Sequence, residues 1–491
     1  MNQRPARALA LTMMAAVALA GCGLKPEVKQ QLSSGQIGGG PGAGSTGGLG
    51  DGTGGLGAGA AGTGTGTGTG GTGGLGAGAT GSGGVGTSGA GGTTGTGGTG
   101  TTGSTGGSGT SGTSGAPVQG AGTTTGINFK DKIIRIALHG PLTGAGVPQD
   151  SFKTGTEKYW KNHKLANGFS VDARAIDDKY NAADASRACS AAADVAFLII
   201  GGAGTDQISA CAQNPKLRRL KVPYLSSGVT EVGLGNIETY HATSLTYKEQ
   251  SPLIVKLAKD QAQFTGKKWA VVITSTPNFR DARDSFTAEL VKNGAQGKLG
   301  AFNPKSSTEG GDVFLTDKAP SNCADLATQL RSGGYQSIYF LGQPAFFAQC
   351  VGLIDTNPYY TGPGPAFGLT SVISLACKAS KNQYRGIYLH PTPSVKEHAP
   401  TQAPGETFKD DIELAIWGSM KQLKEVFDTV KGPLSRESFN ANFDGKRFSG
   451  FPNGVLHPTD FTTDRFGGTA AFANAADCPN AVSKTIGVYA K

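Results

Sequence analysis

The sequence has little that points to catalysis or to crossing a membrane. From residue 131 onward it contains no HExxH, CxxC or GxxxxGK[ST] motif, and none of its six histidines sits in a recognisable nucleophile arrangement. After the N-terminal segment no apolar run is long enough to span a bilayer. Basic residues form no run with interleaved aromatic residues. We therefore expect no enzyme activity, no metal or cofactor, and no nucleic-acid partner.

The first 21 residues read as a processing segment. Arg4 and Arg7 precede an uncharged apolar run at 8–20, which has the length of a signal-peptide core. The run ends in Leu19-Ala20-Gly21-Cys22, which resembles the lipobox of bacterial lipoproteins. The resemblance implies cleavage before Cys22 and lipidation of its thiol, which would hold the protein on the extracytoplasmic face of the cell membrane. An ordinary secretory signal with a chance cysteine is the alternative, and in both cases residues 1–21 are not part of the fold.

Composition then divides the chain into a tether and a folded region. Between residues 33 and 126 nearly every residue is Gly, Thr, Ser or Ala, and Asp51 is the only charge. Such a segment cannot bury enough apolar surface to offset its chain entropy, so 22–127 is expected to be a disordered tether. As a Gly/Ser-type coil it reaches roughly 50 Å. A spacer role fits best, and a pairing or adhesive role is the alternative.

Cysteine usage fits an exported protein. With Cys22 lipidated, six cysteines remain, an even number that indicates three disulfides among fifteen connectivities. Neighbour pairing is favoured because the first two pairs lie in successive helical segments with one strand between them, whereas the third pair follows mainly by elimination. The favoured pairs are Cys189 with Cys211, Cys323 with Cys350, and Cys377 with Cys478.

Residues 128–491 alternate between apolar strand patterns and helical patterns. Strands are expected at 133–138, 171–176, 195–200, 222–225, 269–273 and 337–341. Helices are expected at 152–165, 184–193, 205–212, 251–263, 281–293, 323–332, 408–430 and 435–443. This order predicts βαβ units on parallel sheets, and the length is too great for one core, so we expect two α/β lobes. Asp177 and Asp178 are expected to cap the turn and helix that follow the second strand.

The ordered strand ends resemble those of the type I periplasmic solute-binding proteins, the leucine/isoleucine/valine-binding class. The resemblance rests on four segments, 136–144, 177–178, 199–202 and 222–230, and it extends over 131–491. It implies two flavodoxin-like lobes joined by three crossing segments near 242–247, 388–392 and 456–463. Lobe 1 would then comprise 128–245 and 392–455, and lobe 2 would comprise 246–391 and 456–491.

The same resemblance, together with physics, places a ligand site between the lobes. Ligands of open α/β sheets bind beyond the carboxyl ends of the strands, and the uncapped N–H groups of a helix favour an anion. By resemblance Thr205 takes the place of a hydroxyl that binds the ligand carboxylate, and Gly228 and Thr230 take the place of a carbonyl and a second hydroxyl, with Ser226 nearby. The alternative interpretation makes Thr205 a helix cap and Thr230 a turn hydroxyl.

The second lobe departs from the amino-acid-binding pattern. Phe279 and Phe346 stand near the positions of ligand-contacting tyrosines, with core packing as the alternative role. Where the family places an acid against the ligand ammonium, residues 367–371 read Phe-Gly-Leu-Thr-Ser and contain no acid. A buried ammonium without a counter-charge is costly. An amino acid is thus one candidate ligand, and a small carboxylate or amide with an apolar body fits this pattern better.

The resemblance implies a monomeric, lipid-anchored substrate-binding protein that passes a small solute to an ABC transporter permease. A ligand-sensing receptor subunit of the same fold is the alternative. Removal of the signal segment lowers the formal net charge from +9 to +7, and this modest surplus is spread along the chain.

Overall fold

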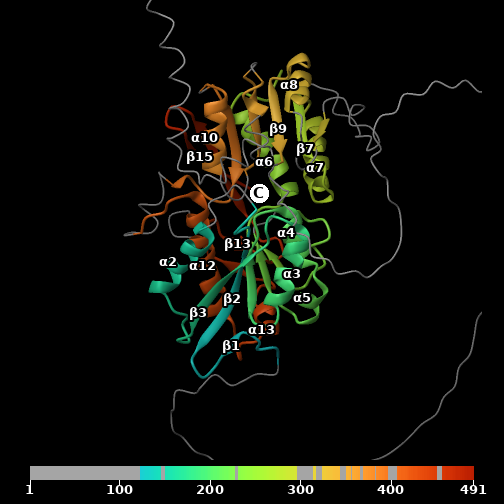
Figure 1. Ribbon diagram of the computed structural model, residues 1–491. Coiled ribbons are helices and arrows are strands. Elements are labelled where there is room, and N and C mark those ends of the chain that lie inside the picture. Colours follow the sequence, from blue (N-terminus) through green and yellow to red (C-terminus); the bar gives the residue numbers. More distant parts are fainter. Residues whose placement is uncertain are drawn as a thin grey trace, which may run out of the picture. The chain divides into compact units, whose positions relative to one another are not determined.

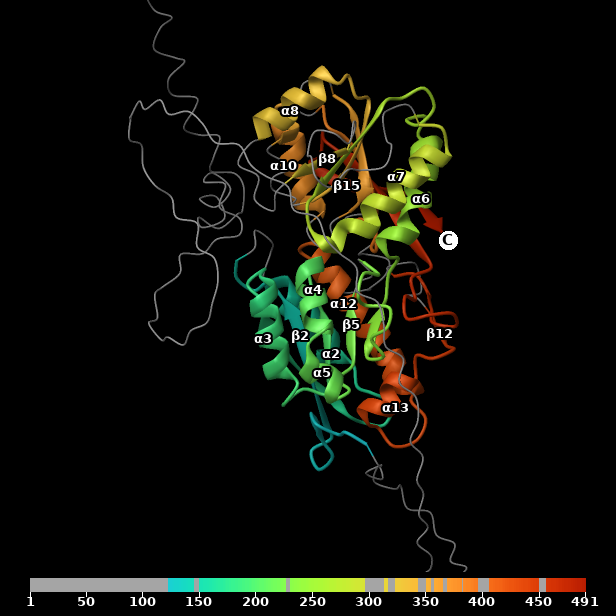
Figure 2. The same cartoon turned by 90° about the vertical axis from the view of Figure 1, so that its right-hand side faces the viewer.

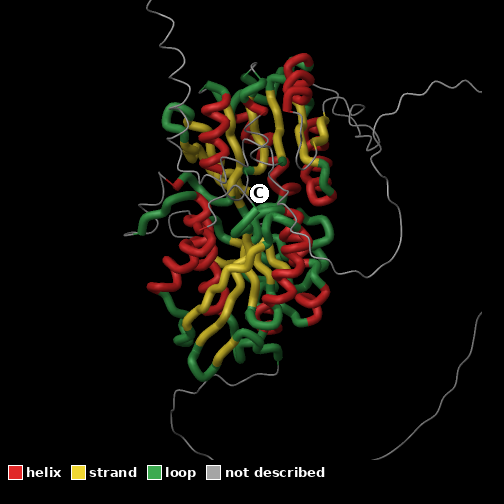
Figure 3. Tube along the Cα trace, in the orientation of Figure 1, coloured by secondary structure: helices red, strands yellow, loops and turns green. Residues whose placement is uncertain are grey.

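The computed structural model describes most of the chain after residue 121. The described ranges are 122–144, 150–226, 230–295, 313–316, 323–342, 350–354, 357–364, 369–381, 383–395, 406–449 and 456–491. They form α-helices and two large β-sheets, with the strands inside and the helices outside (Figure 3). Among these residues no helix is both long and apolar enough to cross a membrane.

The first sheet contains six strands. In chain order they are β1 (Ile127–Asn128), β2 (Ile133–Gly140), β3 (Ser170–Asp177), β4 (Leu198–Gly201), β5 (Tyr224–Ser226) and β6 (Tyr240–Ala242). β2 pairs in parallel with β3 on one edge and with β4 on the other, and β5 and β6 continue the sheet beyond β4. β1 adds a short antiparallel pairing at the start of β2. The parallel strands therefore end together at one edge of the sheet.

Helices cover both faces of this sheet (Figure 1). On one face lie α3 (Ala182–Ala192), α4 (Thr205–Ala212) and α5 (Pro215–Arg219), and on the other lie α2 (Asp150–Asn162), α12 (Asp411–Thr429) and α13 (Arg436–Ala441). The strand side chains alternate between the two cores. Ala137 and Ile199 pack with the first group, whereas Ile136 and Leu138 pack with the second. Burial on both faces explains why these strands are apolar throughout.

The second sheet contains seven strands in the order β15-β14-β11-β10-β9-β7-β8. Their bounds are β7 (Trp269–Thr274), β8 (Val313–Thr316), β9 (Ser337–Leu341), β10 (Tyr359–Pro363), β11 (Arg385–His390), β14 (Ala470–Asp477) and β15 (Val482–Ala490). The strands from β7 to β11 are parallel to one another, whereas β14 and β15 form an antiparallel hairpin at one edge. The sheet is thus mixed, whereas the sequence predicted parallel pairing alone.

This sheet is also covered on both faces (Figure 2). One face carries α6 (Tyr247–Asp260) and α7 (Arg280–Lys292), and the other carries α8 (Cys323–Ser332) and α10 (Leu369–Ala379). Val271 and Ile273 face α6 and α7, whereas Ala270 and Val272 face α8 and α10. The core under α6 and α7 is continuous with the core under α3 and α4 of the first sheet, so the two sheets share buried apolar contacts.

The chain passes between the sheets in segments that meet at a small cavity. Thr243 and Ser244 follow β6, Pro391 and Thr392 follow β11, and all four line a space of about 30 Å³ with Leu456 and His457. The short strands β12 (Arg447–Phe448) and β13 (Thr459–Asp460) pair next to it. These are the three regions where crossing segments are expected, and the lobe boundaries themselves stay a prediction.

Three disulfides tie neighbouring elements together. Cys189–Cys211 joins α3 to α4, and Cys377–Cys478 joins α10 to the end of β14. Cys323–Cys350 links α8 to the residues that follow β9. This is the pairing that the sequence analysis favours.

Candidate functional site

The turn between β4 and α4 opens the candidate site. Gly201 and Gly202 have φ values of +119° and +95°. A Cβ on Gly201 would lie 2.4 Å from the His139 carbonyl oxygen, so this turn requires glycine. Gly204 is the N-cap of α4 and no side chain caps it. The N-terminal N–H groups of α4 are therefore without a side-chain cap, the arrangement that favours binding of an anionic group.

Thr205 is the first residue of α4, not its cap. Its side chain is 6% exposed, and its Oγ1 shares a hydrogen bond of 3.1 Å with the Tyr247 hydroxyl. Tyr247 begins α6, behind the capping box formed by Thr246 and Glu249. The hydroxyl that the sequence places against a ligand thus lies at the meeting point of the two sheets.

Phe279 lies on the other side of Tyr247. It ends a short 3-10 turn, η1 (Pro277–Phe279), directly before α7, and its ring meets the Tyr247 ring edge-on with centroids 5.7 Å apart. Phe279 is partly buried against the core shared by the sheets. Thr205 and Phe279, which lie more than 70 residues apart, therefore both contact Tyr247.

Two further polar groups of α4 reach the same turn. Asp206 Oδ1 accepts hydrogen bonds from Thr276 Oγ1 at 2.9 Å and from Asn278 Nδ2 at 2.5 Å. Ser209 Oγ donates to Asn278 Oδ1 at 3.2 Å. α4 is thus held directly against residues 276–278 through Asp206 and Ser209, a contact between elements of the two sheets that the sequence analysis did not anticipate.

Thr230 makes a contact of the same kind. It is fully buried, and its Oγ1 donates to Asp281 Oδ2 at 2.9 Å, while the Glu231 N–H donates to the same oxygen at 2.8 Å. Asp281 lies in the first turn of α7. Thr230 also accepts a hydrogen bond from the Val232 N–H, so its turn role and its contact with α7 coexist.

The remaining predicted site residues are either turned inward or not described. Ser226 is buried at the end of β5, where its Oγ shares a 2.9 Å hydrogen bond with the Tyr240 hydroxyl. Gly228, Phe346 and Cys22 lie outside the described residues. Thr205, Thr230 and Phe279 are therefore the predicted residues that the structure brings to the region between the sheets.

Below the site, a buried polar group links three strands. His139 Nε2 lies 2.9 Å from Asp178 Oδ2, and His139 Nδ1 shares a 2.8 Å hydrogen bond with the Tyr224 hydroxyl. Both members of the His139–Asp178 pair have fully buried side chains. Asp177 and Asp178 accept from the Lys179 and Tyr180 N–H groups, so they stabilise the turn after β3, whereas Asn181 caps α3. The cap of α3 is therefore Asn181, three residues after Asp178, and not Asp177 or Asp178 as expected.

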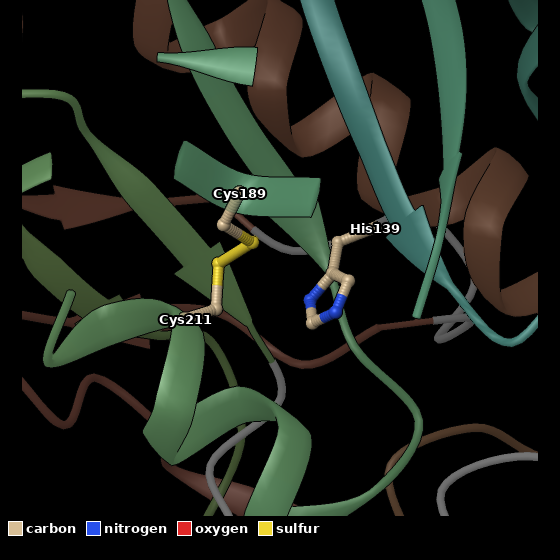
Figure 4. Close-up of side chains that lie close together, drawn as sticks. All are labelled: His139, Cys189 and Cys211. Atoms are coloured by element: carbon tan, nitrogen blue, oxygen red, sulfur yellow. A yellow bond between two sulfur atoms is a disulfide. The ribbon is translucent and has the colours of Figure 1, made fainter. Parts of the chain in front are cut away.

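His139 also lies beside a disulfide (Figure 4). Its ring nitrogen and the sulfur atoms of Cys189 and Cys211 lie within 4.8 Å of one another, a spacing that would suit a metal ion. The two sulfur atoms are bonded to each other, however, so they are not available as thiolate ligands. This cluster packs the back of α4 onto the sheet and forms no metal centre.

Two α/β/α sandwiches, with the carboxyl ends of their parallel strands near the contacts between the two sheets, define the type I periplasmic binding fold. Solved structures with this fold superpose on the chain. They include a leucine-binding protein from Thermotoga maritima (TM-score 0.57, 15% identity, 72% of this chain and 98% of that chain) and a fatty acid ABC transporter substrate-binding protein from Thermomonospora curvata (0.59, 15%, 74% and 93%). A third is an ABC transporter solute-binding protein from R. palustris in complex with 4-hydroxybenzoate (0.56, 16%, 73% and 97%).

At these identities the similarity establishes the fold, and it covers 72–74% of this chain. No protein-family model and no curated protein matches the sequence. The fold was predicted from the order of the strand ends, and the superpositions confirm it.

The sequence analysis missed Tyr247, Asn278 and Asp281. Tyr247 and Asp281 are the first and second residues of their helices, and Asn278 lies in the turn before α7. The sequence did contain a signal, namely a polar residue at the start of a helix that follows a predicted strand. This signal does not reveal which residue beside the other sheet the polar residue contacts.

Proposed function

We propose that this protein is a lipid-anchored, extracytoplasmic substrate-binding protein. It binds a small organic solute, such as an amino acid, a small carboxylate or an amide, between its two α/β lobes and delivers it to the permease of an ABC importer. It acts by binding alone, as a monomer held at the membrane through Cys22 and the Gly-rich tether.

The observation that carries this proposal is the set of contacts that join the two sheets at Tyr247 and at Asp281. Thr205 and Thr230 lie beside the first sheet, and Phe279 and Asp281 lie beside the second. Thr230 donates directly to Asp281, and Thr205 and Phe279 both contact Tyr247. Hinge closure of two lobes on a solute needs polar groups of both lobes at their meeting edge. The uncapped start of α4 supplies the donors for an anionic end, and the Phe279 ring supplies an apolar surface.

A ligand-sensing receptor subunit would use the same fold and the same kind of site. A permease and an ATPase encoded beside this gene would favour transport, whereas an adjacent kinase or receptor gene would favour sensing.

The site is tested with two threonine variants. A thermal-shift screen of amino acids, small carboxylates and amides identifies a ligand, which at a hundred times its Kd adds roughly 2.7 kcal/mol to the free energy of unfolding. Thr205→Val and Thr230→Val are each expected to weaken its binding by about 1–3 kcal/mol, roughly five- to a hundredfold. Thr328→Val is the control, because that hydroxyl bonds only its own helix α8 in the described structure. Unchanged affinity in both site variants, with a lowered melting temperature, would place the ligand elsewhere.

A further inference from the structure

Gln207 is a buried polar residue whose side chain has no hydrogen-bond partner in the described part of the chain. It is the third residue of α4 and is 6% exposed, and its amide forms no hydrogen bond with another described residue. Buried amide groups are nearly always hydrogen-bonded, because removing one from water is otherwise costly. Gln207 therefore has unused hydrogen-bonding capacity beside the candidate site.

The Gln207 side chain turns back over the start of its own helix. A Cβ atom placed on Gly204, the N-cap of α4, would lie 1.9 Å from Gln207 Oε1 and 2.9 Å from its Cδ. Gly204 has a φ of −126°, which any residue can adopt, so glycine is needed here because the amide fills the space of a side chain. The amide thus lies next to the N–H groups at the start of α4, which have no side-chain cap.

Tyr180 borders the same position. A Cβ atom on Gly204 would lie 3.1 Å from Tyr180 Cε2. Tyr180 and the preceding Lys179 have φ values of +55° and +50°, a left-handed conformation that is strained for both residues. Asp177 and Asp178 hold this turn, because their carboxylates accept the N–H groups of these two residues. The Tyr180 hydroxyl, like the Gln207 amide, makes no hydrogen bond with another described residue.

Two carboxylates lie near this position. Asp206 is in the first turn of α4, directly before Gln207. Burial, together with the charges of Asp178 and Asp206, raises the pKa of Tyr180 to about 12, so its hydroxyl keeps its proton at neutral pH and can donate a hydrogen bond. An uncharged acceptor therefore fits this position better than a carboxylate does.

We propose that Gln207 and Tyr180 bind the carboxamide group of an uncharged solute. This inference rests on the proposed function and narrows its solute class. A carboxamide has a carbonyl acceptor and N–H donors, and the Gln207 amide offers the complementary donor and acceptor. The Tyr180 hydroxyl and the start of α4 donate to the same carbonyl oxygen. A carboxylate has no donor, so it would leave the Gln207 carbonyl oxygen unpaired.

The alternative role of Gln207 is to stabilise the start of α4, because a glutamine three residues after an N-cap can reach back to the N-cap N–H. The substitution Gln207→Met distinguishes the two roles, since it keeps the length of the side chain and removes the amide. Loss of a stabilising amide changes the protein without any solute, whereas loss of a solute-binding amide matters only when a solute is present.

Melting curves without solute provide the first test. Gln207→Met is expected to melt at or above the temperature of wild type, because an apolar group replaces a buried amide that has no partner. Gln422→Met is the matched control. Gln422 of α12 is 8% exposed and its Nε2 donates to Thr459 Oγ1 at 3.1 Å, so this variant should melt lower. A decrease for Gln207→Met as large as that of the control would assign Gln207 a structural role and overturn the inference.

Calorimetric titration provides the second test, with pairs of probes that differ in amide against carboxylate. The pairs are butanamide with butanoate, benzamide with benzoate, and 3-phenylpropanamide with 3-phenylpropanoate. For at least one pair, wild type is expected to bind the amide at least about tenfold more tightly. Gln207→Met should remove that preference and change the carboxylate less than about twofold. Tyr180→Phe should weaken both members of the pair, because a hydroxyl donor serves either group.

The other results of the titrations contradict the inference in different ways. Preference of wild type for the carboxylates, or equal loss of both members of a pair in Gln207→Met, overturns the amide subsite and leaves the proposed function intact. Unchanged amide affinity in Gln207→Met does the same. If no probe binds wild type, the amide subsite and the proposed function both fail for these solute classes.

Discussion

At the residue scale, several polar side chains are fully buried, and each depends on a defined partner. Arg436 of α13 is the largest case. It has no exposed surface, and its guanidinium donates to the carbonyl oxygens of Phe197, Leu220, Ala193 and Ala196. Burial lowers the pKa of Arg436 to about 10, so it remains charged at neutral pH. It thereby joins α13 to the ends of α3 and β4 far from the candidate site.

His241 of β6 makes stability depend on pH. It is fully buried, stacks on Phe443 with centroids 4.0 Å apart, and Nε2 lies 3.3 Å from Asn440 Oδ1. Burial, aided by the Arg465 charge, lowers its pKa from 6.5 to about 3. The unfolded chain therefore binds the proton more readily between pH 6.5 and 3, and stability falls as the pH falls through this window.

We expect His241 to lower the free energy of unfolding by about 2 kcal/mol between pH 7 and pH 5. The unfolded chain takes up a proton in this range and the folded chain does not, which costs about 1.4 kcal/mol for each tenfold rise in proton concentration. Urea unfolding of wild type and His241→Asn at both pH values measures it, and the variant should lose less stability on acidification than wild type. An equal loss in both proteins would assign the dependence elsewhere, for example to His457, whose pKa is also lowered by burial.

At the element scale, the position of α4 in the candidate site is fixed by three contacts. Its N-terminus follows the glycine turn after β4, its Asp206 side chain bonds Thr276 and Asn278, and Cys211 near its end is bonded to Cys189 of α3. The Cys377–Cys478 bond lies instead between α10 and the end of β14. The two bonds therefore support different parts of the molecule.

Double Cys→Ala substitutions that remove Cys189–Cys211 or Cys377–Cys478 should differ in their effects on stability and on ligand binding. Sequence separations of 22 and 101 residues predict that loss of Cys377–Cys478 destabilises the protein by about 1 kcal/mol more, because the longer loop gains more entropy on unfolding. Loss of Cys189–Cys211 should weaken ligand binding more, because it frees α4. Urea unfolding and calorimetry on the same two variants check both expectations. The opposite order in either measurement would contradict this division.

At the scale of the whole molecule, the three buried cores are built from residues after 126. The first described residues attach to the fold at α13, where Thr123 donates from its N–H and its hydroxyl to the Glu437 carboxylate. Cys22, the proposed anchor, lies outside the described residues and far from these cores in the sequence. Anchoring and folding should therefore be separable.

We expect Cys22→Ser to release the protein from the membrane fraction while its melting temperature stays within error of that of the soluble, signal-processed chain. Fractionation of cells that express wild type or the variant, followed by immunoblotting, measures the release. A variant of unchanged fold that still sediments with membranes would refute lipid attachment at Cys22.

Local sequence patterns predicted elements of both sheets. The expected segments at 205–212, 323–332 and 337–341 coincide with α4, α8 and β9. Their apolar spacing and flanking glycines act within a few residues, so a linear pattern contains the information. The antiparallel hairpin of β14 and β15 was not predicted. In β15 the apolar residues Ile486 and Val488 are exposed whereas Ser483 is buried, so the sequence does not show which face is the core, and β15 pairs only after the chain has returned to the second sheet.

The sequence by itself determined the fold class, the pairing favoured for the six cysteines after residue 188 and the placement of Thr205 at a helix start. Only the tertiary structure decided which side chains the site residues contact. Thr230 and Asp281 are 51 residues apart, and Thr205 and Tyr247 are 42 apart. Neither pair shares a local pattern. Such contacts depend on how the two sheets pack against each other, and this packing is set by the sum of many apolar contacts and not by these polar pairs alone.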